Sequence, residues 1–376
     1  MVNAIHPRVA SLFTPFALGS LELANRLVMA PMTRQHSPAG VPGADVARYY
    51  RRRAEGGIGL IITEGTYIDH PAANGYENAP DFFGEQALAG WQRVVDEVHA
   101  AGAKIIPQLW HVGNERRPGM PHDPSVPGYG PMTIEENGQV VVKGMSIDDI
   151  YEVIASYARA ARDAERLGFD GLEIHAAHGY LLDTFLWART NRRDDEYGGS
   201  LENRLRLPIE VVRAMRAEVS DDFPIVLRFS QWKMSDYEAR IAETPDELRT
   251  ILSALAEAGV DIFHASTRRF WEPAFEGSDA NLATWARELT GKPVITVGSI
   301  GLDKAFGPDQ FAGTADPNAG RADIDTLIER MDAGAFDLVA VGRALLSDPD
   351  WPAKIRAGRF ADTVDFDRTA LTTLVV

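Results

Sequence analysis

The amino-acid sequence predicts an α/β fold, a single closed (β/α)8 barrel with long loops at the carboxyl ends of its strands. Short apolar runs alternate eight times with longer segments of helical periodicity. Polar residues or glycine follow nearly every run, as at the functional rim of such barrels. The 376 residues are 45% hydrophobic, enough for one large core, so we expect residues 1–376 to form one domain. A doubly wound open sheet is the structural alternative.

The eight predicted strands are short runs dominated by aliphatic side chains. The fourth is the start of the Gly171–Tyr180 stretch, where Leu172 and Ile174 lead into His175. The other seven, in chain order, are Leu27–Ala30, Gly59–Thr63, Lys104–Ile106, Pro224–Phe229, Asp261–Ala265, Val294–Val297 and Leu338–Val341.

Each strand is followed by a segment that predicts a helix. Glu85–Ala101 places five apolar side chains at helical spacing, and Ser146 is the predicted N-cap of a helix that Gly168 ends. The predicted helices, in chain order, are Asp45–Glu55, Glu85–Ala101, Ser146–Leu167, Leu201–Val219, Thr244–Ala258, Asn281–Leu289, Asp323–Ala333 and Trp351–Arg356.

Three long stretches without helical periodicity follow strands and would crowd the carboxyl rim. They are Gly113–Gly144, Ser266–Ala280 and Gly301–Gly320. The dipeptide Asn137-Gly138 indicates a hairpin in the first of them. We therefore expect approximately residues 113–144 to be an inserted loop and hairpin over the barrel rim.

Composition excludes several classes of function. The net charge of −16, with no basic block to offset it, argues against nucleic acid or an anionic membrane as a partner. The absence of cysteine excludes disulfides, thiolate metal sites and a cysteine nucleophile. Residues 1–16 lack a secretory signal pattern, and no apolar run approaches the ~18 residues of a membrane span. We expect a cytoplasmic protein.

Seven strand ends carry polar residues or glycine. One such end would be an ordinary loop start, but seven on one rim indicate a functional site. They are Pro31-Met32-Thr33-Arg34, Glu64-Gly65-Thr66, Gln108-Leu109-Trp110-His111, His175–Tyr180, Arg228-Phe229-Ser230, Gly298–Gly301 and Gly342-Arg343.

The ends of the last two strands have the composition of a phosphate site. Gly298-Ser299 and Gly342-Arg343 can present backbone N–H groups, which form the usual phosphate site of such barrels. Arg343 adds a fixed positive charge. The glycine-rich Gly56–Gly59 precedes a strand and is therefore not a dinucleotide fingerprint.

His175, His178 and Tyr180 allow two interpretations. Two imidazoles three residues apart, with His111 as a third, could bind a metal in a barrel hydrolase, although no carboxylate pattern completes that site. Alternatively, two neutral donors facing a carbonyl oxygen would stabilise an enolate, and a phenol nearby could deliver a proton.

Together these residues resemble the Old Yellow Enzyme family of FMN-dependent ene-reductases. The resemblance spans essentially the whole chain, from Leu12–Pro15 to Asp348-Pro349. Its specific motifs are Ala30–Arg34, Gln108-Leu109-Trp110, the His175, His178 and Tyr180 set, and Asp195–Arg204.

The resemblance implies a TIM barrel that binds FMN non-covalently across the carboxyl ends of its strands. Arg228 would approach flavin N1 and stabilise the reduced anion. Gln108 would contact the pyrimidine edge. The residues along the isoalloxazine would be Pro31, Met32, Thr33 and Gly65, and those at the phosphate Gly298, Ser299, Gly342 and Arg343.

The resemblance also implies a reaction. NAD(P)H would reduce the flavin, which would pass hydride from N5 to the β-carbon of an alkene activated by a carbonyl or nitro group. The substrate oxygen would bind His175 and His178, Tyr180 would protonate the α-carbon, and Trp110 would line the pocket. Phe270 and Trp271 either line the same pocket or lie at the surface.

Two stretches stand apart from this catalytic assignment. Asp195–Arg204 is expected to cap a helix and fix the loop that holds Tyr180, without a chemical role. Ser230–Arg240 lacks the glycine-rich loop of many relatives, which predicts a rebuilt entrance to the site. Two alternative functions stay open: a metal-dependent hydrolase that uses His175 and His178, and a flavin-binding barrel without turnover. The sequence leaves undetermined the physiological alkene, the choice between NADH and NADPH, and the oligomeric state.

Overall fold

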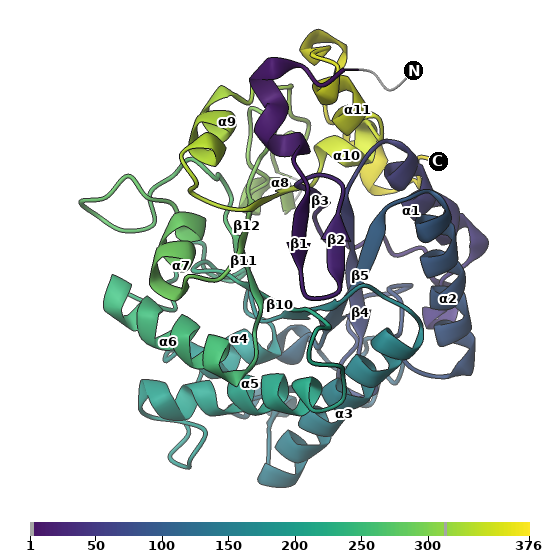
Figure 1. Cartoon of the computed structure of the whole chain (residues 1–376). Coiled ribbons are helices and arrows are strands. Elements are labelled where there is room, and N and C mark those ends of the chain that lie inside the picture. The colour runs from purple at the N-terminus through teal and green to yellow at the C-terminus, as the bar shows by residue number, and fades with distance from the viewer. Residues whose placement is uncertain (1–3, 312–313) are drawn as a thin grey trace.

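Eight parallel strands close into a barrel in the computed structural model, which describes residues 4–311 and 314–376 (Figure 1). The strand β13 pairs with β3, which closes the ring and confirms the predicted fold class over the open sheet. In chain order the strands are β3 (Leu27–Met29), β4 (Leu60–Tyr67), β5 (Lys104–Trp110), β9 (Leu172–His175), β10 (Ile225–Phe229), β11 (Ile262–Ser266), β12 (Val294–Val297) and β13 (Leu338–Val341).

The helices that alternate with these strands surround the barrel (Figure 1), within a few residues of their predicted bounds. Ser146 caps its helix as predicted: its hydroxyl accepts from the Asp149 N–H, and the Asp149 carboxylate accepts from the Ser146 N–H. The helices are α1 (Ala44–Glu55), α2 (Glu85–Ala100), α3 (Ile147–Arg166), α5 (Leu201–Arg216), α6 (Pro245–Ala258), α7 (Leu282–Thr290), α9 (Asp325–Asp332) and α11 (Trp351–Arg356).

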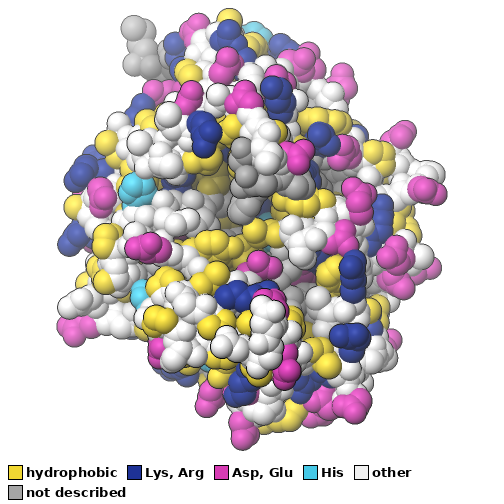
Figure 2. Space-filling model, turned by 180° about the vertical axis from the view of Figure 1, so that it is seen from behind, with side chains coloured by type: hydrophobic (Ala, Val, Ile, Leu, Met, Phe, Trp, Pro, Cys, Tyr) yellow, Lys and Arg dark blue, Asp and Glu magenta, His cyan; other side chains and the backbone are white. Residues whose placement is uncertain are grey.

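An unpredicted hairpin, β1 (Phe16–Leu18) and β2 (Leu21–Leu23), closes the amino-terminal end of the barrel (Figure 1). Phe16, Leu21 and Leu23 pack against the aliphatic side chains that fill the barrel interior. Because this end is filled, a ligand must enter from the opposite rim. Seen from behind, the molecule is hollowed near its centre (Figure 2).

Further short elements lie in the connections. β6 (Gly128–Gly130), β7 (Ile134–Glu136) and β8 (Gln139–Gly144) form a three-stranded sheet, and the β7–β8 hairpin turns at Asn137 and Gly138, both with positive φ. The remaining elements are the helices α4 (Leu181–Leu186), α8 (Pro308–Phe311) and α10 (Ala344–Ser347) and the 3₁₀ helices η1 (Pro7–Phe13), η2 (Pro38–Gly40), η3 (Gly113–Glu115), η4 (Phe360–Asp362) and η5 (Arg368–Leu371).

The long stretch Gly301–Gly320 contains α8, and its residues 312–313 lie outside the described part of the chain. Across the described residues, we find no helix with both the length and the apolar character needed to cross a membrane.

Candidate active site

A cavity of about 400 Å³ lies at the carboxyl ends of the strands, a volume within the usual range for a cofactor or ligand site. Its wall brings together residues from strand ends that are far apart in the sequence. The predicted site residues that line it are Pro31, Met32, Thr33, His178, Arg228, Gly298, Ser299, Gly342 and Arg343.

Five predicted site residues are not part of this lining: Gly65, Gln108, Trp110, His175 and Tyr180. A Cβ atom on Gly65 would lie 2.4 Å from the Trp110 indole, so glycine lets that ring pack against β4. The Gln108 amide nitrogen donates to Glu173 over 2.7 Å inside the barrel. The roles of Gly65 and Gln108 toward a flavin therefore stay predictions.

His175, His178, Tyr180 and Trp110 form one buried cluster at the ends of β5 and β9. The ring centroid of His175 is 5.1 Å from that of His178 and 4.9 Å from that of Tyr180. Trp110 stacks on His175 at 6.0 Å and meets Tyr180 edge-on at 4.8 Å. Because His178 lines the cavity, the cluster lies directly beside it.

Burial keeps these titratable groups neutral. It lowers the pKa of His175 and His178 well below the usual range, and the positive charge of Arg228 lowers both further. Burial likewise raises the pKa of Tyr180 well above its usual range. The site therefore offers two uncharged imidazoles and a phenol that keeps its proton at neutral pH.

The loop that carries these groups is tied to a buried ion pair. His178 has φ 66°, in the left-handed region, and its carbonyl accepts from the Met234 N–H at 3.1 Å. The Gly179 N–H donates to Asp183 at 2.6 Å, and Asp183 pairs with Lys233 at 2.9 Å, both side chains being fully buried. This pair links α4 to the loop after β10.

Arg228 is a buried cation with incomplete hydrogen bonding. Its Nη2 donates to the Ser266 hydroxyl over 3.2 Å, while its Nε has no partner in the described part of the chain. Ser266 also contacts Nε2 of His178 at 2.8 Å. A buried donor without a partner is costly, so a guanidinium with an unpartnered Nε beside a cavity suits an electron-rich ligand edge. These features fit the flavin edge that the sequence predicts for Arg228.

The end of the cavity formed by Gly298 and Arg343 has the geometry of an anion site. Gly298 has φ 149°, and a Cβ there would lie 2.7 Å from the Thr267 hydroxyl, so only glycine fits. Arg343 forms no ion pair with any carboxylate of the described residues, and burial lowers its pKa to about 10. These features fit a phosphate at this end.

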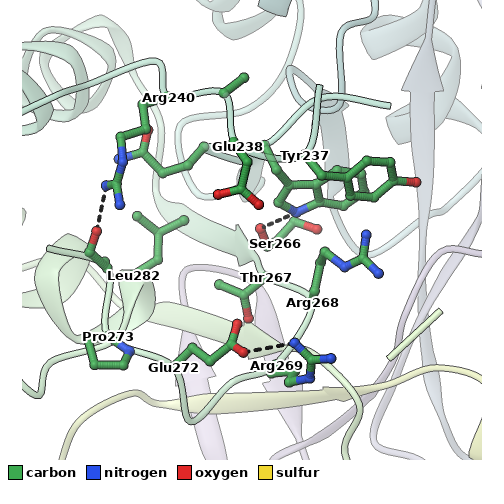
Figure 3. A pocket seen from close by; sticks show the side chains of 14 residues that line it. Tyr237, Glu238, Arg240, Ser266, Thr267, Arg268, Arg269, Glu272, Pro273 and Leu282 are labelled. Carbon is green, nitrogen blue, oxygen red and sulfur yellow. Dashed lines mark hydrogen bonds and ion pairs between the residues drawn. The ribbon is translucent and has the colours of Figure 1, made fainter. Parts of the chain in front are cut away.

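Sequence reasoning missed the aromatic side chains that the loop after β10 brings to the site. Trp232 stacks on His178 with centroids 4.4 Å apart, and Tyr237 lies nearly parallel on Trp232 at 5.3 Å. Both also line an adjoining cavity of about 160 Å³ (Figure 3). The available signal was the departure of Ser230–Arg240 from the family pattern, and the structure shows an aromatic wall there.

The other aromatic pair considered, Phe270 and Trp271, lies apart from the large cavity. The two rings meet edge-on at 5.2 Å and line a separate space of about 260 Å³. The Asp195–Arg204 stretch has the capping role assigned to it: the Ser200 hydroxyl accepts from the Asn203 N–H at the start of α5.

Comparison with known proteins gives a consistent result. The profile of the NADH:flavin oxidoreductase / NADH oxidase family matches residues 11–316. An NADH oxidase of Thermoanaerobacter brockii is 35% identical over 93% of this chain, which spans 51% of that relative's length. The chanoclavine-I aldehyde reductase of Penicillium roqueforti is 35% identical, with 93% of this chain and 90% of that protein covered.

Solved structures show the same barrel. The structure of morphinone reductase in complex with tetrahydroNAD superposes with a TM-score of 0.78 at 31% identity, covering 96% of this chain and 93% of that one. The Old Yellow Enzyme homologue from Zymomonas mobilis gives a TM-score of 0.79 at 25% identity and covers 96% of each chain.

Proposed function

The chain belongs to the NADH:flavin oxidoreductase / NADH oxidase family and is an FMN-dependent oxidoreductase of the Old Yellow Enzyme type, and we propose that it reduces an alkene activated by a carbonyl or nitro group, with NAD(P)H as the electron donor. The observation that carries the proposal is the buried cluster of two neutral imidazoles and a protonated phenol beside the large cavity.

The cavity wall would hold the cofactor. Arg228 would donate from its unpartnered Nε to the electron-rich edge of the ring system, and Arg343 would bind the phosphate. Pro31, Met32 and Thr33 would contact the flat face of the ring. The chemistry that bound FMN supplies is two-electron hydride transfer, from NAD(P)H to the β-carbon of the alkene.

His175 and His178 would orient the substrate by its oxygen. His175 Nδ1 accepts from the Ala177 N–H at 3.4 Å, so the single proton of the neutral ring lies on Nε2, where it can be donated. His178 would exchange its contact with Ser266 for the substrate oxygen. Two such donors stabilise the negative charge that develops on that oxygen.

Tyr180 would supply the proton for the α-carbon. Its hydroxyl lies 3.2 Å from the Tyr76 hydroxyl and 3.2 Å from the Met234 sulfur, so no base removes its proton in the resting site. Burial raises its pKa, which keeps the proton available across the neutral range.

The family match and the relatives support flavin chemistry rather than a metal-dependent hydrolase that uses His175 and His178. The partners proposed are the activated alkene and NAD(P)H. A reducing, cytoplasmic location is supported by a sequence that contains no cysteine.

A spectroscopic experiment tests the proposal. The purified protein should be yellow, NADPH should bleach it under anaerobic conditions, and cyclohexenone should restore the colour. A colourless preparation that takes up no FMN would contradict the proposal, and colour that cyclohexenone fails to restore would indicate a flavin-binding barrel without turnover.

Tyr180→Phe tests the proton donor. Reoxidation by cyclohexenone should slow by about 10²–10⁴-fold, the usual contribution of a general acid, while bleaching by NADPH changes little. Stopped-flow absorbance separates these two half-reactions. Equal slowing of both would assign Tyr180 a structural role instead.

A further inference from the structure

Arg268 is a cation without an acidic partner at the wall of the large cavity. It follows the carboxyl end of β11, lines the cavity and forms no ion pair with a carboxylate among residues 4–311 and 314–376. Its guanidinium lies 4.3 Å from the ring centroid of Tyr237, which supports it by a cation–π contact (Figure 3). The side chain is thus held in place, but its charge is not neutralised.

The neighbouring arginines of this region do have partners. Arg269 pairs with Glu272 at 2.8 Å, and Arg240 donates to the Ala274 carbonyl at 2.7 Å (Figure 3). Arg268 therefore differs from Arg269 and Arg240 in that it lines the large cavity and has no ion-pair partner among the described residues.

Arg268 and Arg343 converge on the same loop. Arg343 donates to the Lys304 carbonyl, and Nη2 of Arg268 lies where it would be 2.7 Å from a Cβ atom on Gly307. The positive charge of Arg268 contributes to the lowered pKa of Arg343, after the larger effect of burial. Two guanidiniums at the wall of one cavity make that region favourable for an anion.

The backbone of the Arg268 loop is also joined to the glycine-rich strand end. The Ser299 hydroxyl donates to the Arg268 carbonyl at 2.9 Å, and Gly298 packs against the Arg269 and Phe270 N–H groups. The Arg268 backbone therefore adjoins Gly298 and Ser299, while its guanidinium lies over Tyr237 and 6.0 Å from the ring centroid of Trp232.

Building on the proposed function, we propose that Arg268 is a second phosphate-binding cation, which clamps the phosphate of FMN together with Arg343. A phosphomonoester carries close to two negative charges at neutral pH, and two guanidiniums match that charge. Planar guanidinium groups also bind phosphate oxygens in pairs. Tyr237 holds Arg268 in position for this contact.

Comparing FMN with riboflavin isolates the phosphate. Holoenzyme is stripped of flavin, and binding of each flavin is measured by fluorescence quenching. Arg268→Gln should weaken FMN binding about 10- to 100-fold, the usual effect of losing a charged hydrogen-bond partner, and leave riboflavin binding unchanged. Inorganic phosphate should compete with FMN in the wild type and compete less well in Arg268→Gln.

Arg269→Gln is the matched control and should leave the affinity for both flavins unchanged. Arg268→Lys, which keeps the charge, should lose less FMN affinity than Arg268→Gln, and it also serves if the glutamine variant does not fold. Equal weakening of both flavins, or no weakening of FMN, would overturn the inference. A raised KM for NADPH with unchanged FMN affinity would assign the cation to the nicotinamide cofactor and overturn it too. A wild type that binds neither flavin would contradict the proposed function instead.

Discussion

The barrel interior and the cavity wall both bury polar and charged side chains, but ion pairs between them are found in the interior. Inside the barrel, Glu173 accepts from Gln108 at 2.7 Å and pairs with His264 at 2.6 Å. At the cavity wall, Arg228 has a free Nε, and Arg343 meets no carboxylate in the described ranges of the chain. Since an unpaired buried charge is costly, we expect the unpaired cations that line the cavity to bind an anionic or electron-rich ligand.

The largest loss of stability should come from removing one member of a buried ion pair. Asp183→Ala leaves the Lys233 ammonium buried without its carboxylate, and we expect a loss of about 3–5 kcal/mol in the free energy of unfolding. Urea denaturation measures it. The double variant Asp183→Ala, Lys233→Met should recover much of the loss, because no unpaired charge remains.

Glu218→Ala is the control for this comparison. Glu218 pairs with Arg162 at 3.5 Å on the surface, where an ion pair contributes about 0–1 kcal/mol. If Asp183→Ala lowers the free energy of unfolding by no more than Glu218→Ala does, the buried pair contributes no more to stability than a surface pair.

Glu64 is intermediate between the paired and the unpaired buried charges, since its carboxyl group is buried and accepts hydrogen bonds from backbone N–H groups. Its Oε2 accepts from the Arg34 N–H at 2.7 Å and the Gln35 N–H at 3.2 Å, which fixes the segment that carries Thr33. Burial raises its pKa from the ordinary 4.5 to about 7. Between these pH values the folded state keeps a proton that the unfolded state releases.

Stability should therefore fall as the pH rises from 4.5 through 7, by on the order of 3 kcal/mol from Glu64 alone. Glu64→Gln cannot titrate, so the difference in unfolding free energy between the wild type and this variant should change across that pH window. Urea denaturation at pH 5 and pH 8 measures it, and parallel pH profiles for the two proteins would refute the assignment.

The strand ends could be predicted from the sequence because the barrel topology determines where they lie. Once eight apolar runs alternate with helices, the carboxyl ends must meet at one rim, and this brings Thr33, Arg228 and Arg343 to one cavity without any knowledge of their contacts. The closeness of His175, His178 and Tyr180 follows from their spacing along one strand end.

Contacts between loops could not be predicted from the sequence. Asp183 and Lys233 are 50 residues apart, and nothing local in either segment indicates that they pair. The stack of Trp232 on His178 likewise joins two segments that are far apart in the sequence, and neither segment indicates the contact. The β1–β2 hairpin was missed because strands of three residues are too short to show a clear alternation.

The smallest expected change in stability is at the cavity wall. Arg228→Gln removes a buried cation that has no ion-pair partner among the described residues, so the unfolding free energy of the flavin-free protein should change by only about 1 kcal/mol, while FMN affinity falls about 10- to 100-fold. Arg216→Gln is the converse, because Arg216 pairs with Asp261 and donates to the Phe223 and Gly259 carbonyls away from the cavity. That variant should lose stability and keep its FMN affinity. Urea denaturation of the flavin-free protein and fluorescence titration with FMN measure the two quantities. If both variants lose stability and affinity together, missing partners do not mark the ligand site in this barrel.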